Sequence, residues 1–223
     1  EEIANFTEQI VQFLMAYDPK MVVIACNTAT AVALERIRKL VPVPVLGVIA
    51  PGARAAIERT KTGRIGVIGT ERTILSGAYE AALRRIAPDV RVVSLACPTF
   101  VPIVEQGRFD SEDAAELVCD ALEPLRREAI DTLILGCTHY PFLAPRIQAC
   151  MGDGVALISS ADQTARDVST LLHFYGMLAA SWEEPEHRFF SSGDAERFRW
   201  IAQAWVGRPV DVTTVHWKEP KLI

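Results

Sequence analysis

Short apolar segments alternate with amphipathic segments along nearly the whole chain. MVVIAC, at residues 21–26, is apolar and rich in β-branched residues, which predicts a buried parallel strand. The same criteria predict further strands over residues 64–70, 90–97, 132–137, 155–160, 187–192 and 211–217. A proline-rich segment, residues 41–51, is predicted to be extended.

Helical patterns fill the stretches between these strands. Near the start of the chain, apolar residues recur at three- and four-residue spacing and predict a helix: Ile3, Phe6, Ile10, Phe13 and Leu14. Ser111 is followed by acidic residues, a signal for a helix start, so we expect a helix over residues 111–129. Further helices are predicted at residues 31–40, 53–59, 73–86, 142–150, 162–174 and 194–205.

This alternation of strands and helices predicts the α/β class, with mostly parallel sheets flanked by helices. Residues 22–38 and 133–148 repeat one order of features: an apolar strand, a small residue, a cysteine, polar residues and a helix. We therefore expect two similar α/β lobes with the active site in the cleft between them. The first lobe is expected to hold residues 1–49 and 161–223, and the second residues 50–160.

The two cysteines of this repeat, Cys26 and Cys137, are candidates for chemistry. In open α/β sheets, ligands bind at the carboxyl ends of the strands, where both cysteines are predicted to lie. A helix start can lower a thiol pKa from about 8.5 to roughly 3.5–7.5, so each residue is a candidate base or nucleophile. The alternative is a small buried core residue. Matched positions in two segments favour function.

The other three cysteines, Cys97, Cys119 and Cys150, lack this setting and are interpreted as packing residues. An odd number of cysteines without a secretory signal favours reduced thiols over a disulfide framework.

Polar residues directly after each candidate cysteine suit a small anion. Asn27 and Thr28 follow the first cysteine, and Thr138 and His139 follow the second, so side-chain donors and backbone N–H groups occur together. A dicarboxylate or an amino acid fits such a pair of sites. His139 could exchange a proton with the cysteine two residues before it. The alternative is a histidine that is hydrogen-bonded within the packing.

The charge balance argues against nucleic acid as a partner. The chain has 23 Lys+Arg and 28 Asp+Glu, a formal net charge of −5, with no local block of basic residues. No apolar run reaches the roughly 18–20 residues that span a bilayer, which argues against a membrane partner. Residues 1–18 lack the basic region of a signal peptide. These features predict a cytoplasmic protein.

Neither a cofactor nor a metal is predicted. Pyridoxal phosphate requires a lysine, and the five lysines are predicted at strand starts, helix ends or the tail: Lys20, Lys39, Lys61, Lys218 and Lys221. Cys137 and His139 are the one close Cys/His pair of the sequence, with no CxxC or HExxH spacing to complete a metal site. GRIGVIG, at residues 63–69, lacks the spacing of the dinucleotide fingerprint.

Several motifs occur in a fixed order. ACNTATA at residues 25–31 and LGCTHYP at residues 135–141 enclose a GTxxT segment at residues 69–73 and FVPIVEQG at residues 100–107. HRFFSSGDAERF follows at residues 187–198. This ordered set resembles the glutamate racemases of the aspartate/glutamate racemase superfamily, and the likeness runs along essentially the whole chain.

The resemblance implies a cofactor-independent bacterial isomerase that interconverts L- and D-glutamate and supplies D-glutamate for peptidoglycan. Cys26 and Cys137 match the two catalytic thiols of the family, which serve opposite faces of the substrate α-carbon. Glu105 matches an acidic residue that stands behind the histidine, here His139. The family's contacts with glutamate fall on Asn27, Thr28, Thr73 and Thr138. Members are often homodimers, which is an expectation from the family alone.

The resemblance also predicts parts that precede Glu1 in the family. These are a strand ending in a DSG(V/I)GG motif and a loop ending in a tyrosine-glycine pair, which carry an aspartate partner of the first thiol, a serine donor and the central strand of the first lobe. Two alternatives stay open. One is a related racemase acting on aspartate or another amino acid, and the other is a non-catalytic chain that only binds a ligand or a protein.

Overall fold

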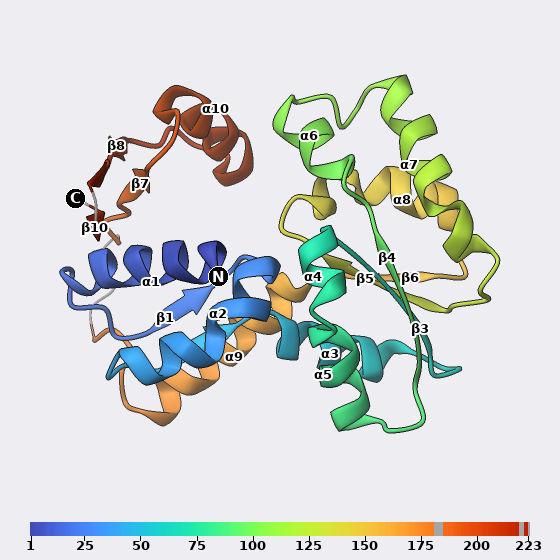
Figure 1. The fold of residues 1–223 in the computed structure, drawn as a ribbon, viewed down its shortest axis with the longest axis horizontal. Helices are drawn as coiled ribbons and strands as arrows, with labels where there is room; N and C mark the ends of the chain where they lie inside the picture. Colours follow the sequence, from blue (N-terminus) through green and yellow to red (C-terminus); the bar gives the residue numbers. More distant parts are fainter. Residues whose placement is uncertain (181–184, 219–220, 223) are drawn as a thin grey trace.

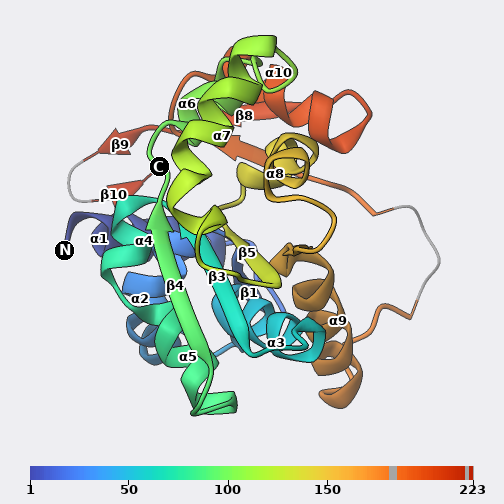
Figure 2. The ribbon, with the colours of Figure 1, turned by 90° about the vertical axis from the view of Figure 1, so that its right-hand side faces the viewer.

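The computed structural model describes residues 1–180, 185–218 and 221–222. A four-stranded parallel sheet forms the larger part of the core, in the order β4 (Arg91–Ala96), β3 (Arg64–Gly69), β5 (Thr132–Gly136) and β6 (Ala156–Ile158). Figure 2 shows β4, β3 and β5 side by side. All of β5 is buried, because helices cover both faces of the sheet.

Two helical layers enclose this sheet (Figure 1). Leu133 and Leu135 of β5 face a cluster formed with α6 (Phe100–Glu105), α7 (Glu112–Arg126) and α8 (Ala144–Met151). Ile134 faces the opposite cluster, formed with α3 (Ile49–Arg59) and α5 (Ala78–Ile86). Successive residues of a strand point to opposite faces, so an unbroken apolar run is buried from both sides. The predicted α/β class is confirmed.

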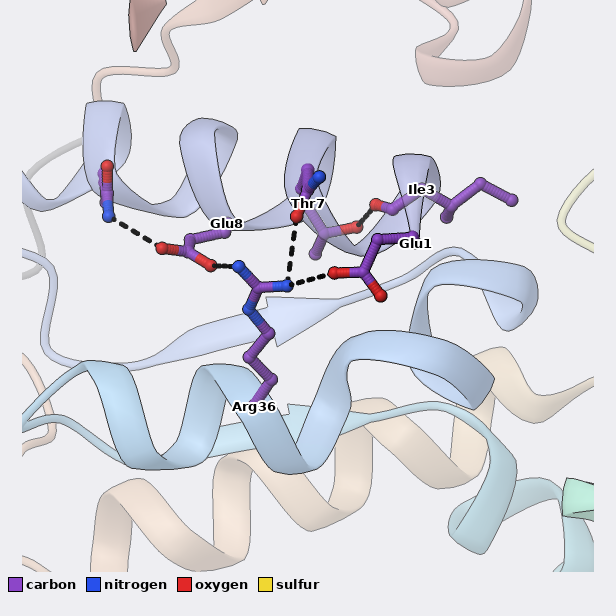
Figure 3. Close-up of polar contacts among 7 residues, drawn as sticks. Glu1, Ile3, Thr7, Glu8 and Arg36 are labelled. Carbon is purple, nitrogen blue, oxygen red and sulfur yellow. Dashed lines mark hydrogen bonds and ion pairs between the residues drawn. The ribbon is translucent and has the colours of Figure 1, made fainter. Parts of the chain in front are cut away.

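A second, smaller parallel pair lies beside this unit. β1 (Val22–Ile24) pairs with β2 (Val45–Gly47), and α1 (Glu2–Met15) packs on α2 (Asn27–Leu40). Arg36 of α2 joins the two helices, because its guanidinium pairs with the carboxylates of Glu1, at 3.3 Å, and Glu8 (Figure 3). The strand end of β1 and the start of α2 place the first candidate cysteine.

The last part of the chain lies against α1. After α9 (Ser160–Phe174), β7 (Phe189–Ser191) pairs in parallel with β8 (Val212–Thr214), and α10 (Ala195–Val206) connects them. β9 (Trp217–Lys218) and β10 (Lys221–Leu222) form an antiparallel pair. The ring of Phe190 lies 5.2 Å from that of Phe13, and the ring of Trp217 lies 5.0 Å from that of Phe6. Figure 1 shows this segment above α1.

The predicted first helix is present, but its apolar residues are divided between two neighbours. Small residues and Val11 are buried, whereas Phe6 and Ile10 stay partly exposed. The reason is that α1 packs on α2 by one side while its aromatic residues meet the last part of the chain on another.

Three local predictions differ from the structure, and one helix was not predicted. The helix expected over residues 73–86 is two helices, α4 (Glu71–Leu75) and α5, because Gly77 between them has a left-handed backbone with φ +64°. The extended segment ends early, since α3 begins at Ile49, with Pro51 in its first turn, where a missing N–H costs nothing. The helix predicted over residues 142–150 is a 3₁₀ turn, η1 (Tyr140–Leu143), followed by α8. No helix was predicted at α6, which has only six residues.

The remaining cysteines are packing residues, as predicted. Cys97 and Cys150 are buried in the cluster under α6 to α8, and Cys119 packs partly buried against it. Burial raises the pKa of Cys97 to about 12, so its thiol stays protonated. Among the described residues, no helix combines the length and apolarity that a membrane span requires.

Candidate active site

Cys26 lies where β1 ends and α2 begins, and its side chain is exposed. It is the N-cap residue of α2, and its Sγ accepts a hydrogen bond from the backbone N–H of Ala29 at 3.5 Å. The unpaired N–H groups of the first turn and the positive end of the helix dipole favour anions at this position. The predicted place of this thiol at a helix start is therefore confirmed.

Cys137 lies in a different setting from Cys26. It follows β5 directly and is buried, but the next α-helix begins only at Ala144. The intervening turn contains Pro141, and Pro145 stands in the first turn of α8, where proline is well tolerated. The helix predicted from residue 142 thus begins two residues later, and Cys137 does not lie at the start of an α-helix as the sequence suggested.

This setting changes the acidity of the thiol. Burial raises the pKa of Cys137 above its ordinary value, although the backbone N–H of His139 opposes the rise and a charge on Cys26 adds to it. The pKa-lowering helix start that the sequence suggested is missing here, so the prediction of a lowered pKa is wrong for Cys137. The thiol form is favoured near neutral pH. Because Cys26 contributes to the raised pKa of Cys137, the two residues lie close enough to interact electrostatically.

A cavity of about 440 Å³ lies between the ends of β1 and β5. Ala25 and Asn27, on either side of Cys26, line it together with Cys137 and Thr138. Ser160, at the start of α9, lines it from a third direction. The cavity therefore lies at the carboxyl ends of parallel strands from both sheets, where α/β proteins bind ligands.

Three threonine hydroxyls join the start of α2 to the start of α4. Oγ1 of Thr28 lies 2.9 Å from Oγ1 of Thr70 and 2.9 Å from Oγ1 of Thr73, and the last two are 3.0 Å apart. Thr28 and Thr73 were expected at the site, whereas Thr70 was not. The structure brings these hydroxyls into one cluster, in which each can donate one hydrogen bond.

Asn27 is the most buried of the polar residues that follow the two cysteines. Its exposed fraction is 3%, and its Oδ1 accepts a hydrogen bond from the Tyr79 hydroxyl at 2.6 Å. Because buried amides are normally satisfied, this bond accounts for the oxygen end of the side chain.

A chain of polar contacts runs from Cys137 to the surface. Nδ1 of His139 lies 3.6 Å from Sγ of Cys137 and 3.4 Å from Oγ1 of Thr138. Nε2 of His139 lies 3.3 Å from Oε1 of Glu105, at the end of α6. Arg197 of α10 then donates to Oε2 of Glu105 at 3.1 Å and to its backbone oxygen at 3.3 Å. The imidazole is thereby held between a thiol and a carboxylate.

α10 also packs aromatic rings against this chain. The indole of Trp205 meets the imidazole of His139 edge-on at 5.9 Å and stacks on Phe142 at 4.4 Å. At Gly107, with φ +68°, a Cβ atom would lie 2.5 Å from the ring of Trp200, so this close approach requires glycine. Figure 1 shows α10 reaching toward α6. The last part of the chain thus contributes directly to the surroundings of the second thiol.

Cys137 lines the cavity between the two α/β units, and Cys26 lies between two residues that line it, Ala25 and Asn27. The family model for Asp/Glu/Hydantoin racemase, a class of isomerases, matches residues 3–168. The chain belongs to this family. It is 52% identical, over 95% of its length, to a protein named glutamate racemase from Bacillus cereus (strain ATCC 10987 / NRS 248), and covers 78% of that protein. A glutamate racemase from Listeria monocytogenes serotype 4b (strain CLIP80459) is 50% identical over 98% of the chain, which covers 82% of it.

Solved structures agree with this assignment. The structure of the glutamate racemase isoform RacE1 from Bacillus anthracis matches with a TM-score of 0.93 at 44% sequence identity. The match covers 99% of this chain and 82% of the RacE1 chain. Glutamate racemase from Francisella tularensis, solved in complex with D-glutamate, matches with a TM-score of 0.89 at 27% sequence identity. This match covers 98% of this chain and 81% of the Francisella chain. The resemblance drawn from the motifs is therefore confirmed.

The sequence interpretation missed the residues that support the predicted ones. Thr70 and Arg197 lie inside segments that the motifs included, GTxxT and HRFFSSGDAERF, so a search of those segments for donors could have found them. Tyr79 and Trp205 stand at ordinary aromatic positions of helices, and no local pattern distinguishes them.

Proposed function

We propose that this chain interconverts L- and D-glutamate, with Cys26 and Cys137 exchanging protons with the α-carbon from opposite faces. The observation that carries the proposal is the cavity at the ends of β1 and β5, which collects residues around both thiols. Curated relatives named glutamate racemase share about half of its residues over nearly its whole length, which supports glutamate as the substrate.

The proton balance requires one acid and one base. The Cα–H bond breaks as its proton passes to the thiolate of one cysteine, and the electron pair left on Cα takes a proton from the thiol of the other. Burial favours the thiol form of Cys137, so this residue suits the donor role in one direction. The reverse direction begins with the opposite pair of protonation states.

The α-proton of an amino acid is weakly acidic, so the charge that develops on the carboxylate must be stabilised. Two donors line the cavity, Asn27 and Thr138, and two more, Thr28 and Thr73, belong to the threonine cluster that joins the starts of α2 and α4. In our proposal the hydroxyls of the threonine cluster turn from one another to the substrate carboxylates, while the start of α2 adds its dipole. Because the hydroxyls turn when the substrate binds, they are in place before the proton transfer and need little reorganisation during it.

His139 and Glu105 are proposed to serve Cys137. Contact between Nδ1 and the sulfur lets the imidazole give or take the thiol proton, and Glu105 fixes the ring through Nε2. Arg197 holds the carboxylate of Glu105 from the other side. This proposed chemistry uses only side chains of the protein, without a metal or an organic cofactor.

We also propose the domain boundaries, the cellular role and the oligomeric state. The first lobe comprises residues 1–49 and 161–223 and the second residues 50–160, which separates the β1–β2 pair from the four-stranded sheet. D-Glutamate made in the cytoplasm would supply peptidoglycan synthesis, and the functional form would be a homodimer, as is common in the family.

Exchange of the α-proton with solvent tests the activity directly. The protein is incubated with L-glutamate or D-glutamate in deuterium oxide, and proton NMR follows the Cα signal while polarimetry follows inversion. We expect deuterium at Cα together with racemisation, and much slower exchange with aspartate. Binding of glutamate without exchange would contradict catalysis, and faster exchange with aspartate would contradict the substrate assignment.

A further inference from the structure

Tyr79 of α5 is a buried tyrosine whose hydroxyl reaches the candidate site. The residue is 3% exposed, and its hydroxyl donates to Oδ1 of Asn27 at 2.6 Å. α5 packs on α3 beside the four-stranded sheet, whereas Asn27 opens α2 beside β1. This hydrogen bond therefore connects the two units of the fold at the edge of the cavity, in addition to those of the threonine cluster.

The direction of this hydrogen bond determines what Asn27 offers to a ligand. An asparagine amide has an accepting oxygen at one end and a donating NH₂ group at the other. Since the oxygen receives the Tyr79 proton, the NH₂ group is left to donate, and Asn27 lines the cavity. Without the tyrosine hydroxyl, the amide could turn and present its oxygen, which would repel a carboxylate.

The surroundings of Tyr79 keep its hydroxyl in this role. Burial raises the pKa of Tyr79 far above its ordinary value, and the nearby Ser160 side chain only partly opposes the rise, so the hydroxyl remains protonated. The tyrosine can then direct its own proton to the amide. The ring is also closely confined: a Cβ atom at Gly136 would lie 3.1 Å from Cε2 of Tyr79, and one at Gly52 would lie 3.3 Å from its hydroxyl.

We propose that Tyr79 is a positioning residue, which orients the Asn27 amide so that its NH₂ group donates to the substrate carboxylate. This inference rests on the proposed function, because it assigns a carboxylate ligand to the cavity. It extends that function by naming a residue that acts through another and does not touch the substrate. A donor fixed in advance needs no reorganisation when the ligand binds.

A double-mutant cycle tests this role. The variants are Tyr79→Phe, Asn27→Ala and the pair, and the measurements are the Kd of D-glutamate by calorimetry, KM and kcat in both directions, and urea unfolding. We expect Tyr79→Phe to weaken binding and raise KM about tenfold, because an amide that is no longer oriented loses about one hydrogen bond to a charged group. In the Asn27→Ala background, the same change should alter Kd less than twofold.

Ile37→Val serves as the matched control, since Ile37 is a fully buried residue of α2 that does not line the cavity. It should shift urea unfolding and leave Kd unchanged, which separates loss of stability from loss of orientation. An equal loss of binding from Tyr79→Phe in both backgrounds would overturn the inference, since the tyrosine would then act by packing alone.

The outcomes for the two proposals differ. Failure of the cycle with an active wild-type protein rejects the role of Tyr79 and leaves the proposed function standing. If the wild-type protein binds D-glutamate without racemising it, the proposed catalysis is rejected. The Kd values of the double-mutant cycle then still decide the role of Tyr79. A wild-type protein that does not bind glutamate rejects both.

Discussion

Cys26 and Cys137 end comparable strands, yet their side chains meet different physical conditions. Cys26 is exposed at the N-cap of a long helix, and Cys137 is buried beside a histidine and a short 3₁₀ turn. Desolvation disfavours an anion at the second position. In the proposed mechanism this burial makes Cys137 suited to be the proton donor in one direction.

Replacement of either thiol tests their roles at the scale of the residue. Cys26→Ser and Cys137→Ser should each lower racemisation by at least about 10²–10⁴-fold, because a serine hydroxyl is a far weaker base and acid at this pH. Circular dichroism should show an unchanged fold, because the substitution keeps the size of the side chain. The readout is inversion of D-glutamate by polarimetry.

Cys119→Ser provides the control for this pair, since Cys119 packs against the core cluster under α6 to α8 and does not line the cavity. Its activity should stay close to that of the wild-type protein. Unfolding of Cys26→Ser, or full activity of Cys137→Ser, would return the affected cysteine to a packing role.

At the scale of elements, the hydrophobic pattern predicts what depends on local periodicity. The run at residues 132–137 is apolar at every position, and it forms a strand buried on both faces. The break at Gly77 and the turn after Cys137 depend instead on backbone conformation and on prolines, which periodicity does not register. α6 is too short, six residues, to show a helical period.

α10 is the element whose contribution was least visible in the sequence. Its pattern predicts a helix, but only the tertiary structure brings Arg197 and Trp205 to the surroundings of His139. Half-exposed ion pairs contribute little stability, so we ascribe the value of the Arg197 contact with Glu105 to orientation.

Arg197→Gln should therefore lower kcat roughly tenfold with little change in KM, because Glu105 loses a partner that fixes it against His139 while the donors to the substrate stay in place. Arg197→Lys should restore part of the rate, since it keeps the charge without the guanidinium geometry. Steady-state kinetics in both directions give the comparison.

Arg199 offers a matched change on the same helix, because it pairs with Glu196 within α10. Arg199→Gln should leave both kcat and KM unchanged. A rise in KM with unchanged kcat for Arg197→Gln would contradict orientation of the relay and indicate a binding role instead.

At the scale of the whole molecule, the sequence identified the residues that follow the strand ends but not those that reach them from elsewhere. Cys26, Asn27 and Thr28 are contiguous, so one strand end places all three. Thr70 and Tyr79 come from a different unit of the fold, and their contacts with α2 depend on how the two units pack. Local patterns carry no information about that packing, which is why the supporting residues were missed.

Because the cavity is formed by elements of both units, ligand binding should stabilise the folded molecule as a whole. A ligand that binds only this arrangement adds about 2.7 kcal/mol at a concentration of 100 Kd, which corresponds to a rise in Tm of roughly 5–10 °C for a chain of this size. We expect this rise with D-glutamate in a thermal shift assay, and a smaller one with D-glutamine, which lacks the second carboxylate.

Thr28→Val should reduce the rise caused by D-glutamate, because it removes the hydroxyl that links α2 to both Thr70 and Thr73 and that is proposed to bind the substrate. Its own Tm without ligand provides the reference, so the lost interaction with the ligand is separated from any change in stability. The same rise for Thr28→Val and the wild-type protein would show that glutamate binds away from the threonine cluster.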